Sequence, residues 1–261
     1  MDIYELARKL NIPREVIIKL KPVSGAERYI DGLCTKDYDR YAHELNTTLG
    51  EDEGGFRILS VMLEAALRAH GEYQRRGISE EIFFMTMGCF PRFIGEHLES
   101  FGCYGFDRWW WTGRQTSLSI FRIGSLEYEL GENDEDRWIS VHIPSDADLS
   151  EDAVDSSLLN ARAFLKKFFP AYAGAKFHCH SWLLSPALAK LLPVESKINR
   201  FRERFNILGT DEDADDYKLW VFKNKALSID EFPENTTLQK KMKAYLMQGG
   251  KVGCAWGFIQ E

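Results

Sequence analysis

Apolar residues in the first 108 positions recur at three- and four-residue spacing, the period of helices that bury one face. One stripe covers residues 3–10, and a longer one covers residues 56–67, whose helix we expect to end at Gly71. A third helix is predicted after Ser79, a good N-cap residue followed by two glutamates. Convincing strand alternation does not occur in this part of the sequence. The pattern therefore predicts an all-helical N-terminal domain over residues 1–108.

From residue 109 onward the pattern changes to short segments typical of strands, interrupted by helical ones. The expected strands cover residues 117–122, 126–130, 138–143, 177–182, 217–222 and 252–259, and the first two form a hairpin. The expected helices follow Ser150 and Ser185, cover residues 196–205, and lie near residues 238–247. A long helical crossover separates the third and fourth strands, so these two are predicted to pair in parallel. The predicted fold class is α+β, with a mixed β-sheet domain flanked by helices over residues 109–261.

Composition narrows the classes of function. The 261 residues are 44% hydrophobic, which suffices for well-filled cores. The net charge of −7 argues against a broad nucleic-acid footprint. Five scattered cysteines without a CxxC pair indicate reduced thiols, and no apolar run approaches the ~18 residues of a membrane span. We therefore expect a soluble, cytoplasmic protein with no nucleic-acid or membrane partner; the sequence does not predict its oligomeric state.

Two histidines in the strand over residues 177–182 are the first candidates for chemistry. Side chains alternate along a strand, so His178 and His180 share one face while Cys179 points into the core. His142 lies at the end of the neighbouring third strand and is expected to face the same place. Histidine titrates in the range useful to a general base. The predicted catalytic residues are therefore His178, His180 and His142.

Other interpretations of these histidines stay open. They can be buried side chains satisfied by backbone carbonyls. The pair His178 and His180, with His142 as a third ligand, also resembles a zinc or iron site on a sheet. A thiol nucleophile at Cys179 is a further alternative.

Three stretches carry a resemblance to a known family: EEIFFMTMGCFPRFI at residues 80–94, WWWTGRQTSLSIFRIGSLEYEL at residues 109–130, and CHSWLLSPALAKLLPVESKINRFRERFNIL at residues 179–208. Together with the element order they resemble a bacterial two-domain acyltransferase family, which joins a helical N-acyltransferase N-terminal domain to a GNAT-like C-terminal domain. The resemblance implies an enzyme that transfers an acyl group from acetyl-CoA or another acyl-CoA to a small-molecule amine. No metal is expected.

The resemblance also implies where the donor binds. In GNAT enzymes the third and fourth strands splay apart, the pantetheine arm enters between them, and the pyrophosphate lies at the N-terminus of the intervening helix. The residues implied for donor binding here, through side chains or backbone donors that hold the thioester oxygen, are Ile143, Ser145, Ser181, Trp182 and Ser185.

Two features depart from the family pattern. The segment 143–152 has four acids and no glycine, where the usual signature is glycine-rich. No tyrosine occurs from Ser185 to Phe205, where GNAT enzymes usually place the acid that protonates the leaving thiolate. A second hypothesis is therefore a non-catalytic GNAT-like protein that binds a small ligand after losing its pyrophosphate loop, and a His-liganded metalloenzyme is a third.

Overall fold

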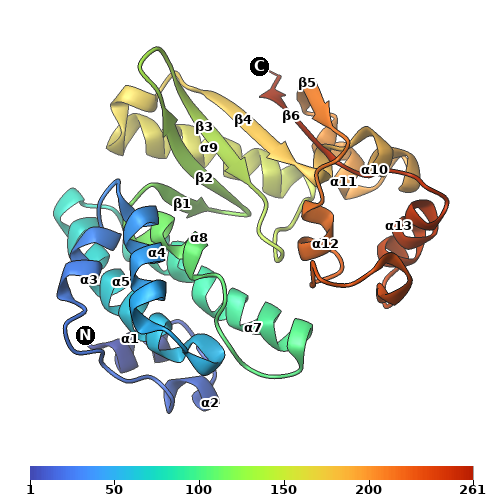
Figure 1. The fold of residues 1–261 in the computed structure, drawn as a ribbon. Helices are drawn as coiled ribbons and strands as arrows, with labels where there is room; N and C mark the ends of the chain where they lie inside the picture. Colours follow the sequence, from blue (N-terminus) through green and yellow to red (C-terminus); the bar gives the residue numbers. More distant parts are fainter. Residues whose placement is uncertain (261) are drawn as a thin grey trace. The chain divides into compact units, whose positions relative to one another are not determined.

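The structure, a computed structural model, describes residues 1–260, and the chain divides into two compact units, Met1–Ile123 and Gly124–Glu261 (Figure 1). The first unit contains the helices α1 (Ile3–Lys9), α2 (Arg14–Ile17), α3 (Glu27–Leu33), α4 (Tyr38–Leu49), α5 (Phe56–Arg76), α6 (Glu80–Met87), α7 (Cys89–Phe101) and α8 (Trp109–Thr116). A short 3₁₀ turn, η1 (Glu53–Gly55), precedes α5, and the strand β1 (Ile120–Ile123) ends the unit.

The start of α6 follows the predicted capping chemistry. The Ser79 hydroxyl accepts a hydrogen bond from the backbone N–H of Ile82 at 3.3 Å and caps α6. The predicted end of α5 at Gly71 is wrong, because the helix continues to Arg76. Its end lies at Gly77, whose φ of 69° is the left-handed conformation that glycine adopts most easily.

The helix α8 belongs to the first unit, although the sequence placed the domain boundary before it, after Arg108. It packs there through specific contacts. The buried Thr116 hydroxyl donates to the backbone carbonyl of Leu33 at 2.7 Å. A Cβ at Gly113 would overlap the ring of Tyr38, so the glycine permits the close approach of α8 and α4.

The second unit contains the strands β2 (Leu126–Glu132), β3 (Arg137–His142), β4 (Lys176–Ser181), β5 (Phe205–Asp211) and β6 (Cys254–Ile259). Its helices are α9 (Glu151–Phe168), α10 (Pro186–Leu191), α11 (Lys197–Arg202), α12 (Asp216–Trp220) and α13 (Thr237–Met247), with the 3₁₀ turns η2 (Pro170–Tyr172), η3 (Trp182–Leu184) and η4 (Ile229–Glu231). Within this unit the strands form a mixed sheet in the order β2-β3-β4-β6-β5. The predicted α+β fold class is confirmed.

Strand directions follow the lengths of the connections. β2 and β3 pair antiparallel, β3 and β4 pair in parallel across the long α9 crossover, and β6 pairs antiparallel with both β4 and β5. The prediction of a strand over residues 217–222 is wrong, because most of this segment lies in the helix α12, which ends at Trp220. Tyr217 and Val221 lie four residues apart, which is helical spacing, and both are buried. The strand in this region is β5 instead.

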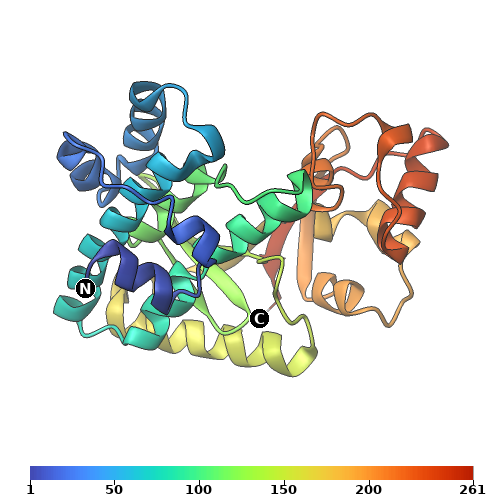
Figure 2. The same cartoon turned by 90° about the horizontal axis from the view of Figure 1, so that it is seen from below.

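The α9 helix packs on one face of the sheet (Figures 1 and 2). Its Ser157 hydroxyl lies 2.8 Å from the Tyr128 hydroxyl of β2, and its Arg162 guanidinium lies 3.9 Å from the centre of the Phe177 ring of β4. Cys179 is also buried on this face, as predicted. Alternation therefore turns the side chains of His178 and His180 to the opposite face.

A second apolar cluster lies beyond the carboxyl ends of β3 and β4, and η3, α10, α12 and α13 contribute to it. Its buried members are Leu183, Leu188, Tyr217, Val221, Phe222, Phe232, Met242, Leu246 and Val252. Among residues 1–260, none of the helices is long and apolar enough to span a lipid bilayer.

Candidate functional site

The parallel register of β3 and β4 is short. It runs from Trp138 opposite Lys176 to Ser140 opposite His178. β3 continues to His142 and β4 continues to Ser181, where it pairs with β6. We call this point, defined by Ser140, His142, His178 and His180, the β3–β4 fork.

The sequence explains why the strands separate there. Ile143 and Pro144 follow β3, and proline has no N–H with which to continue a ladder. On β4, the Ser181 hydroxyl accepts a hydrogen bond from the backbone N–H of Leu183 at 3.1 Å and begins η3. Each strand therefore ends in its own local structure.

The fork brings together the three histidines predicted from sequence. His178 lies at the last paired position, and His142 and His180 lie two residues farther along β3 and β4. Residues two apart on a strand share a face, so all three imidazoles project from the same side of the sheet. Aromatic rings of β6 border two of them: Phe258 lies 5.4 Å from His178 and Trp256 lies 6.0 Å from His180, between ring centres.

Burial and charge act together on His178. The side chain is half-buried, which disfavours the charged imidazolium and lowers its pKa from the ordinary value of 6.5. The neighbouring imidazoles of His180 and His142 lower the pKa further by like-charge repulsion. His178 is therefore held in its neutral form at neutral pH, the form that accepts a proton.

His142 has a carboxylate partner that the sequence pattern did not predict. Its Nε2 lies 2.8 Å from Oε2 of Glu129 on β2, and the two side chains are 26% and 19% exposed. Glu129 pairs with Ser140 in the β2–β3 register, so its side chain projects from the histidine face. The spacing of Glu127 and Glu129 in the predicted hairpin indicates that both carboxylates lie on one face of β2. Only the β2–β3 register shows that this is the face of His142.

The residues predicted to bind the donor have different surroundings. Ile143 and Trp182 are partly buried against the second apolar cluster. Ser145 is exposed in the segment before α9, and Ser181 caps η3. Ser185 is 1% exposed; its hydroxyl caps α10 and donates to the carbonyl of Val252, so its role is structural.

The acidic segment before α9 is matched by basic side chains of α11 and the residues after it. Lys197 Nζ lies 2.8 Å from Oδ1 of Asp148, and Arg200 Nη1 lies 3.6 Å from Oε1 of Glu151. Arg204 pairs with Asp155 one turn farther along α9. These pairs offset the negative charge that the sequence placed at the helix N-terminus. The lysine and arginines are exposed or near the surface, so the pairs exchange readily with solvent ions.

The first turn of α9 also lacks the side-chain cap expected from Ser150. The Ser150 hydroxyl donates to Asp148 Oδ2 at 2.8 Å and makes no capping hydrogen bond to the helix. The Lys197 contact and the hydrogen bonds from Ser150 lower the pKa of Asp148 to about 2. This carboxylate is therefore ionised at any physiological pH.

The three histidines of the fork do not form the ligand set that the metalloenzyme hypothesis requires. Within residues 1–260, no group of three or more His, Cys, Asp and Glu side chains is arranged to hold a metal ion. The thiol alternative is also disfavoured, because complete burial raises the pKa of Cys179 far above its usual range.

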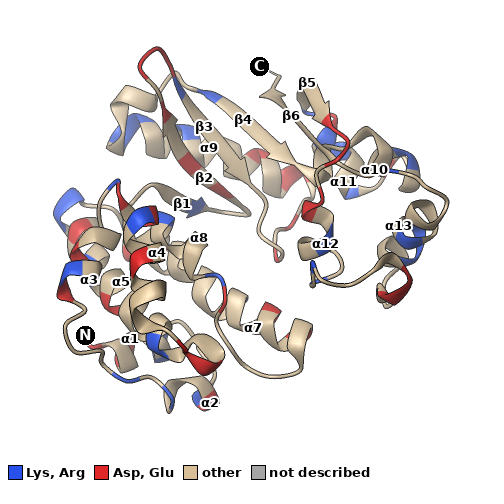
Figure 3. Ribbon diagram, viewed as in Figure 1, with Lys and Arg blue, Asp and Glu red and all other residues tan. Residues whose placement is uncertain are grey.

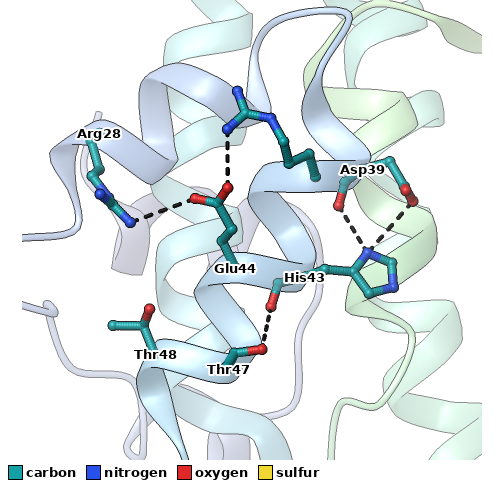
Figure 4. A pocket seen from close by; sticks show the side chains of 7 residues that line it. Arg28, Asp39, His43, Glu44, Thr47 and Thr48 are labelled. Carbon is teal, nitrogen blue, oxygen red and sulfur yellow. Dashed lines mark hydrogen bonds and ion pairs between the residues drawn. The ribbon is translucent and has the colours of Figure 1, made fainter.

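A separate depression of about 580 Å³ lies on α3 and α4 of the first unit (Figure 4). Its charged groups pair with one another: Glu44 accepts from Arg40 at 3.0 Å and lies 3.5 Å from Arg28. His43 and Thr47 also line it. No pattern in the sequence predicts this depression, and it contains none of the predicted site residues.

Two family profiles match the chain over almost all of its length. The N-acyltransferase N-terminal domain matches residues 1–118, and the GNAT-like C-terminal domain matches residues 120–259. Curated proteins with known annotation give no match to this chain.

Solved acyltransferase structures have the same fold. One, in complex with decanoyl-CoA and teicoplanin, is 21% identical with a TM-score of 0.80, over 98% of this chain and 86% of that chain. An acyltransferase mutant in complex with octanoyl-CoA is also 21% identical, with a TM-score of 0.81 and the same coverage. The predicted fold and the predicted acyltransferase assignment are confirmed, and the chain belongs to the N-acyltransferase family in which an N-acyltransferase N-terminal domain precedes a GNAT-like C-terminal domain.

Proposed function

We propose that this chain transfers an acyl group from an acyl-CoA thioester to a small-molecule amine at the β3–β4 fork. The observation that carries the proposal is the end of pairing at Ser140 and His178, with three imidazoles on one face beside it. A polar, titratable cluster at diverging parallel strands suits a reaction that moves one proton.

The chemistry requires a neutral amine. Its nitrogen attacks the thioester carbonyl, a C–N bond forms, the C–S bond breaks, and CoA leaves as a thiolate. An imidazole of the fork accepts the proton that the amine loses and returns it to the thiolate. This transfer replaces the tyrosine that is missing between Ser185 and Phe205. Backbone N–H groups near Ile143 and Ser181 are the proposed donors to the thioester oxygen.

The phosphates of the donor are proposed to lie near the start of α9. The helix N-terminus attracts anions, and Ser150 makes no capping hydrogen bond there. Lys197 and Arg200 are the cations at this place. Their pairing with Asp148 and Glu151 resembles the pairing that a phosphate would make, so the acids compete with the donor for these cations.

The comparisons support a donor with more than an acetyl group and a small-molecule acceptor. Solved structures with this fold hold decanoyl-CoA and octanoyl-CoA, and one also holds teicoplanin. Ile143 and Trp182, which pack partly buried against the second apolar cluster, are the apolar side chains that we propose contact a longer acyl chain beside the fork. We propose a medium-chain acyl donor.

The cytoplasmic location predicted from the sequence stays part of this proposal. The five cysteines are all free thiols, which supports a reducing compartment.

Calorimetry and turnover together test this function. We expect CoA, acetyl-CoA, octanoyl-CoA and decanoyl-CoA to bind, with affinity rising with chain length. We also expect release of free CoA thiol when a panel of primary amines is added. Binding without thiol release for any amine would support the non-catalytic ligand-binding hypothesis. No binding across the donor series would overturn the proposed function.

A further inference from the structure

The contact between Glu129 and His142 has a chemical consequence for the imidazole. A carboxylate only accepts hydrogen bonds, so the nitrogen that faces it must carry a proton. Because His142 Nε2 lies 2.8 Å from Glu129 Oε2, the neutral imidazole is held with its proton on Nε2. Nδ1 is then the nitrogen that accepts a proton. The ring is fixed both in tautomer and in direction.

The β2–β3 ladder fixes this contact geometrically. Glu127 pairs with His142 and Glu129 pairs with Ser140, so both carboxylates project from the same face as the histidine. The two strands are joined by a short turn and paired from Glu127 opposite His142 to Glu132 opposite Arg137. The partner of His142 is therefore placed by rigid backbone, and not by a mobile loop.

The other two imidazoles of the fork have a different environment. His178 borders the Phe258 ring, and His180 borders the Trp256 ring. Both rings belong to β6 and neither can accept a proton. The lowered pKa of His178 also means that it holds an accepted proton weakly. Among residues 1–260, His142 is the imidazole of the three that contacts a carboxylate, the arrangement that orients the histidine of a catalytic triad.

We propose that Glu129 is a positioning residue that fixes His142 as the general base for the amine. The proposal rests on the proposed function and names the proton acceptor within it. In the step, the amine nitrogen bonds to the thioester carbon while its proton passes to Nδ1 of His142. The thiolate of CoA leaves and then takes that proton, so the imidazole returns to its starting tautomer. Glu129 keeps its charge throughout and donates no proton.

Tautomer spectroscopy tests the positioning role without relying on turnover. In protein with ¹⁵N-labelled histidine, the signal of His142 is assigned by its loss in His142→Gln. Long-range ¹H–¹⁵N spectra are then recorded for the wild type, Glu129→Gln and Glu129→Asp. We expect the Nε2–H tautomer in the wild type, a mixture of tautomers in Glu129→Gln and partial recovery in Glu129→Asp. A wild-type His142 in the Nδ1–H tautomer would overturn the proposal.

Kinetics supply the second measurement. Glu129→Gln is expected to lower kcat on the order of 10²-fold with little change in KM for the amine or the donor, because only the base is misplaced. Glu129→Asp is expected to recover part of this loss. The matched control is Glu132→Gln on the same strand, whose carboxylate pairs with Arg137 at 3.2 Å, and which is expected to leave kcat unchanged.

The outcomes separate this proposal from the proposed function. If the wild type transfers no acyl group from any donor, the proposed function fails, and the spectra still decide whether Glu129 orients His142. If the wild type is active and Glu129→Gln is equally active, the positioning role is overturned while acyl transfer stands.

Discussion

Ser140 on β3 and His178 on β4 form the last pair of the parallel register, and beyond them the two strands end in different local structures. The pairing of β3 and β4 thus ends at the place where three histidine side chains lie on one face of the sheet. The other face stays packed against α9 through Tyr128 and Phe177. A closed core and an open, titratable edge therefore share the same two strands.

Replacement of the three histidines separates their roles. We expect His142→Ala to lower kcat by about 10²- to 10⁴-fold, as loss of a general base does, and to leave acyl-CoA binding almost unchanged. His178→Ala and His180→Ala are expected to lower kcat less than His142→Ala does. His43→Gln on α4 is the control and should retain wild-type turnover. Steady-state kinetics with calorimetry provides the comparison, and equal activity of His142→Ala and the wild type would rule out this base.

The lowered pKa of His178 makes stability depend on pH. Its folded pKa lies below the unfolded value of 6.5, so the unfolded chain takes up a proton first as pH falls. The neutral imidazole therefore stabilises the folded protein fully above about pH 6.5, and this stability is lost as pH falls toward the folded pKa.

The measurement is urea unfolding at several pH values between about 7.5 and 5.5. The free energy of unfolding should fall more steeply with acidification in the wild type than in His178→Gln, which keeps a neutral polar side chain at any pH. Parallel curves for the two proteins would show that His178 titrates alike in the folded and unfolded states.

Removing one acidic charge near α9 should strengthen donor binding. Asp148→Asn frees Lys197 from its 2.8 Å contact and removes a negative charge near the proposed phosphate position. We expect Kd for acyl-CoA to fall a few-fold at low salt, the scale of an exposed ion pair, and the gain to shrink as salt rises.

The control for this change is Asp213→Asn. Asp213 is an exposed carboxylate that also contacts a lysine, Lys251, at 2.6 Å, but it lies in the acidic segment between β5 and α12 (Figure 3). Calorimetry should find its acyl-CoA affinity equal to that of the wild type. Equal gains in both variants would indicate a general effect of net charge, and no gain in Asp148→Asn would contradict the proposed phosphate position.

Two serines that both precede helices should differ in their effect on stability. Ser185→Ala removes a buried hydroxyl that caps α10 and donates to the Val252 carbonyl, so we expect a loss of about 1–3 kcal/mol in the free energy of unfolding. Ser150→Ala removes a hydroxyl that makes no capping bond to α9, and we expect a change within about 0.5 kcal/mol. Chemical denaturation measures both. Equal losses would contradict the capping assignments.

The fold was predictable where a periodic pattern had one interpretation. The long stripe that begins at Phe56 predicted α5, and the apolar segment over residues 177–182 predicted β4 with its histidines on one face. The segment 217–222 misled because YKLWVF is rich in strand-forming residues, although Tyr217 and Val221 are spaced for a helix. The end of α5 was predicted wrongly at Gly71, because a glycine inside a long helix costs only about 1 kcal/mol and does not by itself end the helix.

The site was predictable only in part because its contacts depend on strand register. Alternation along single strands placed the histidines correctly. The contact of Glu129 with His142, however, joins residues 13 positions apart across a hairpin. If that register were shifted by one residue, the side chains of Glu129 and His142 would lie on opposite faces of the sheet. The pairing of Lys197 with Asp148 likewise depends on tertiary packing between α11 and the segment before α9.

The most direct test of the account is a crystal structure of the chain with a non-hydrolysable decanoyl-CoA analogue. We expect the atom that replaces the thioester sulfur to lie at the β3–β4 fork, beside Ser140 and His178. The phosphates are expected to lie near Lys197. A donor bound away from both strands, or a β3–β4 register that continues through His142 and His180, would contradict it.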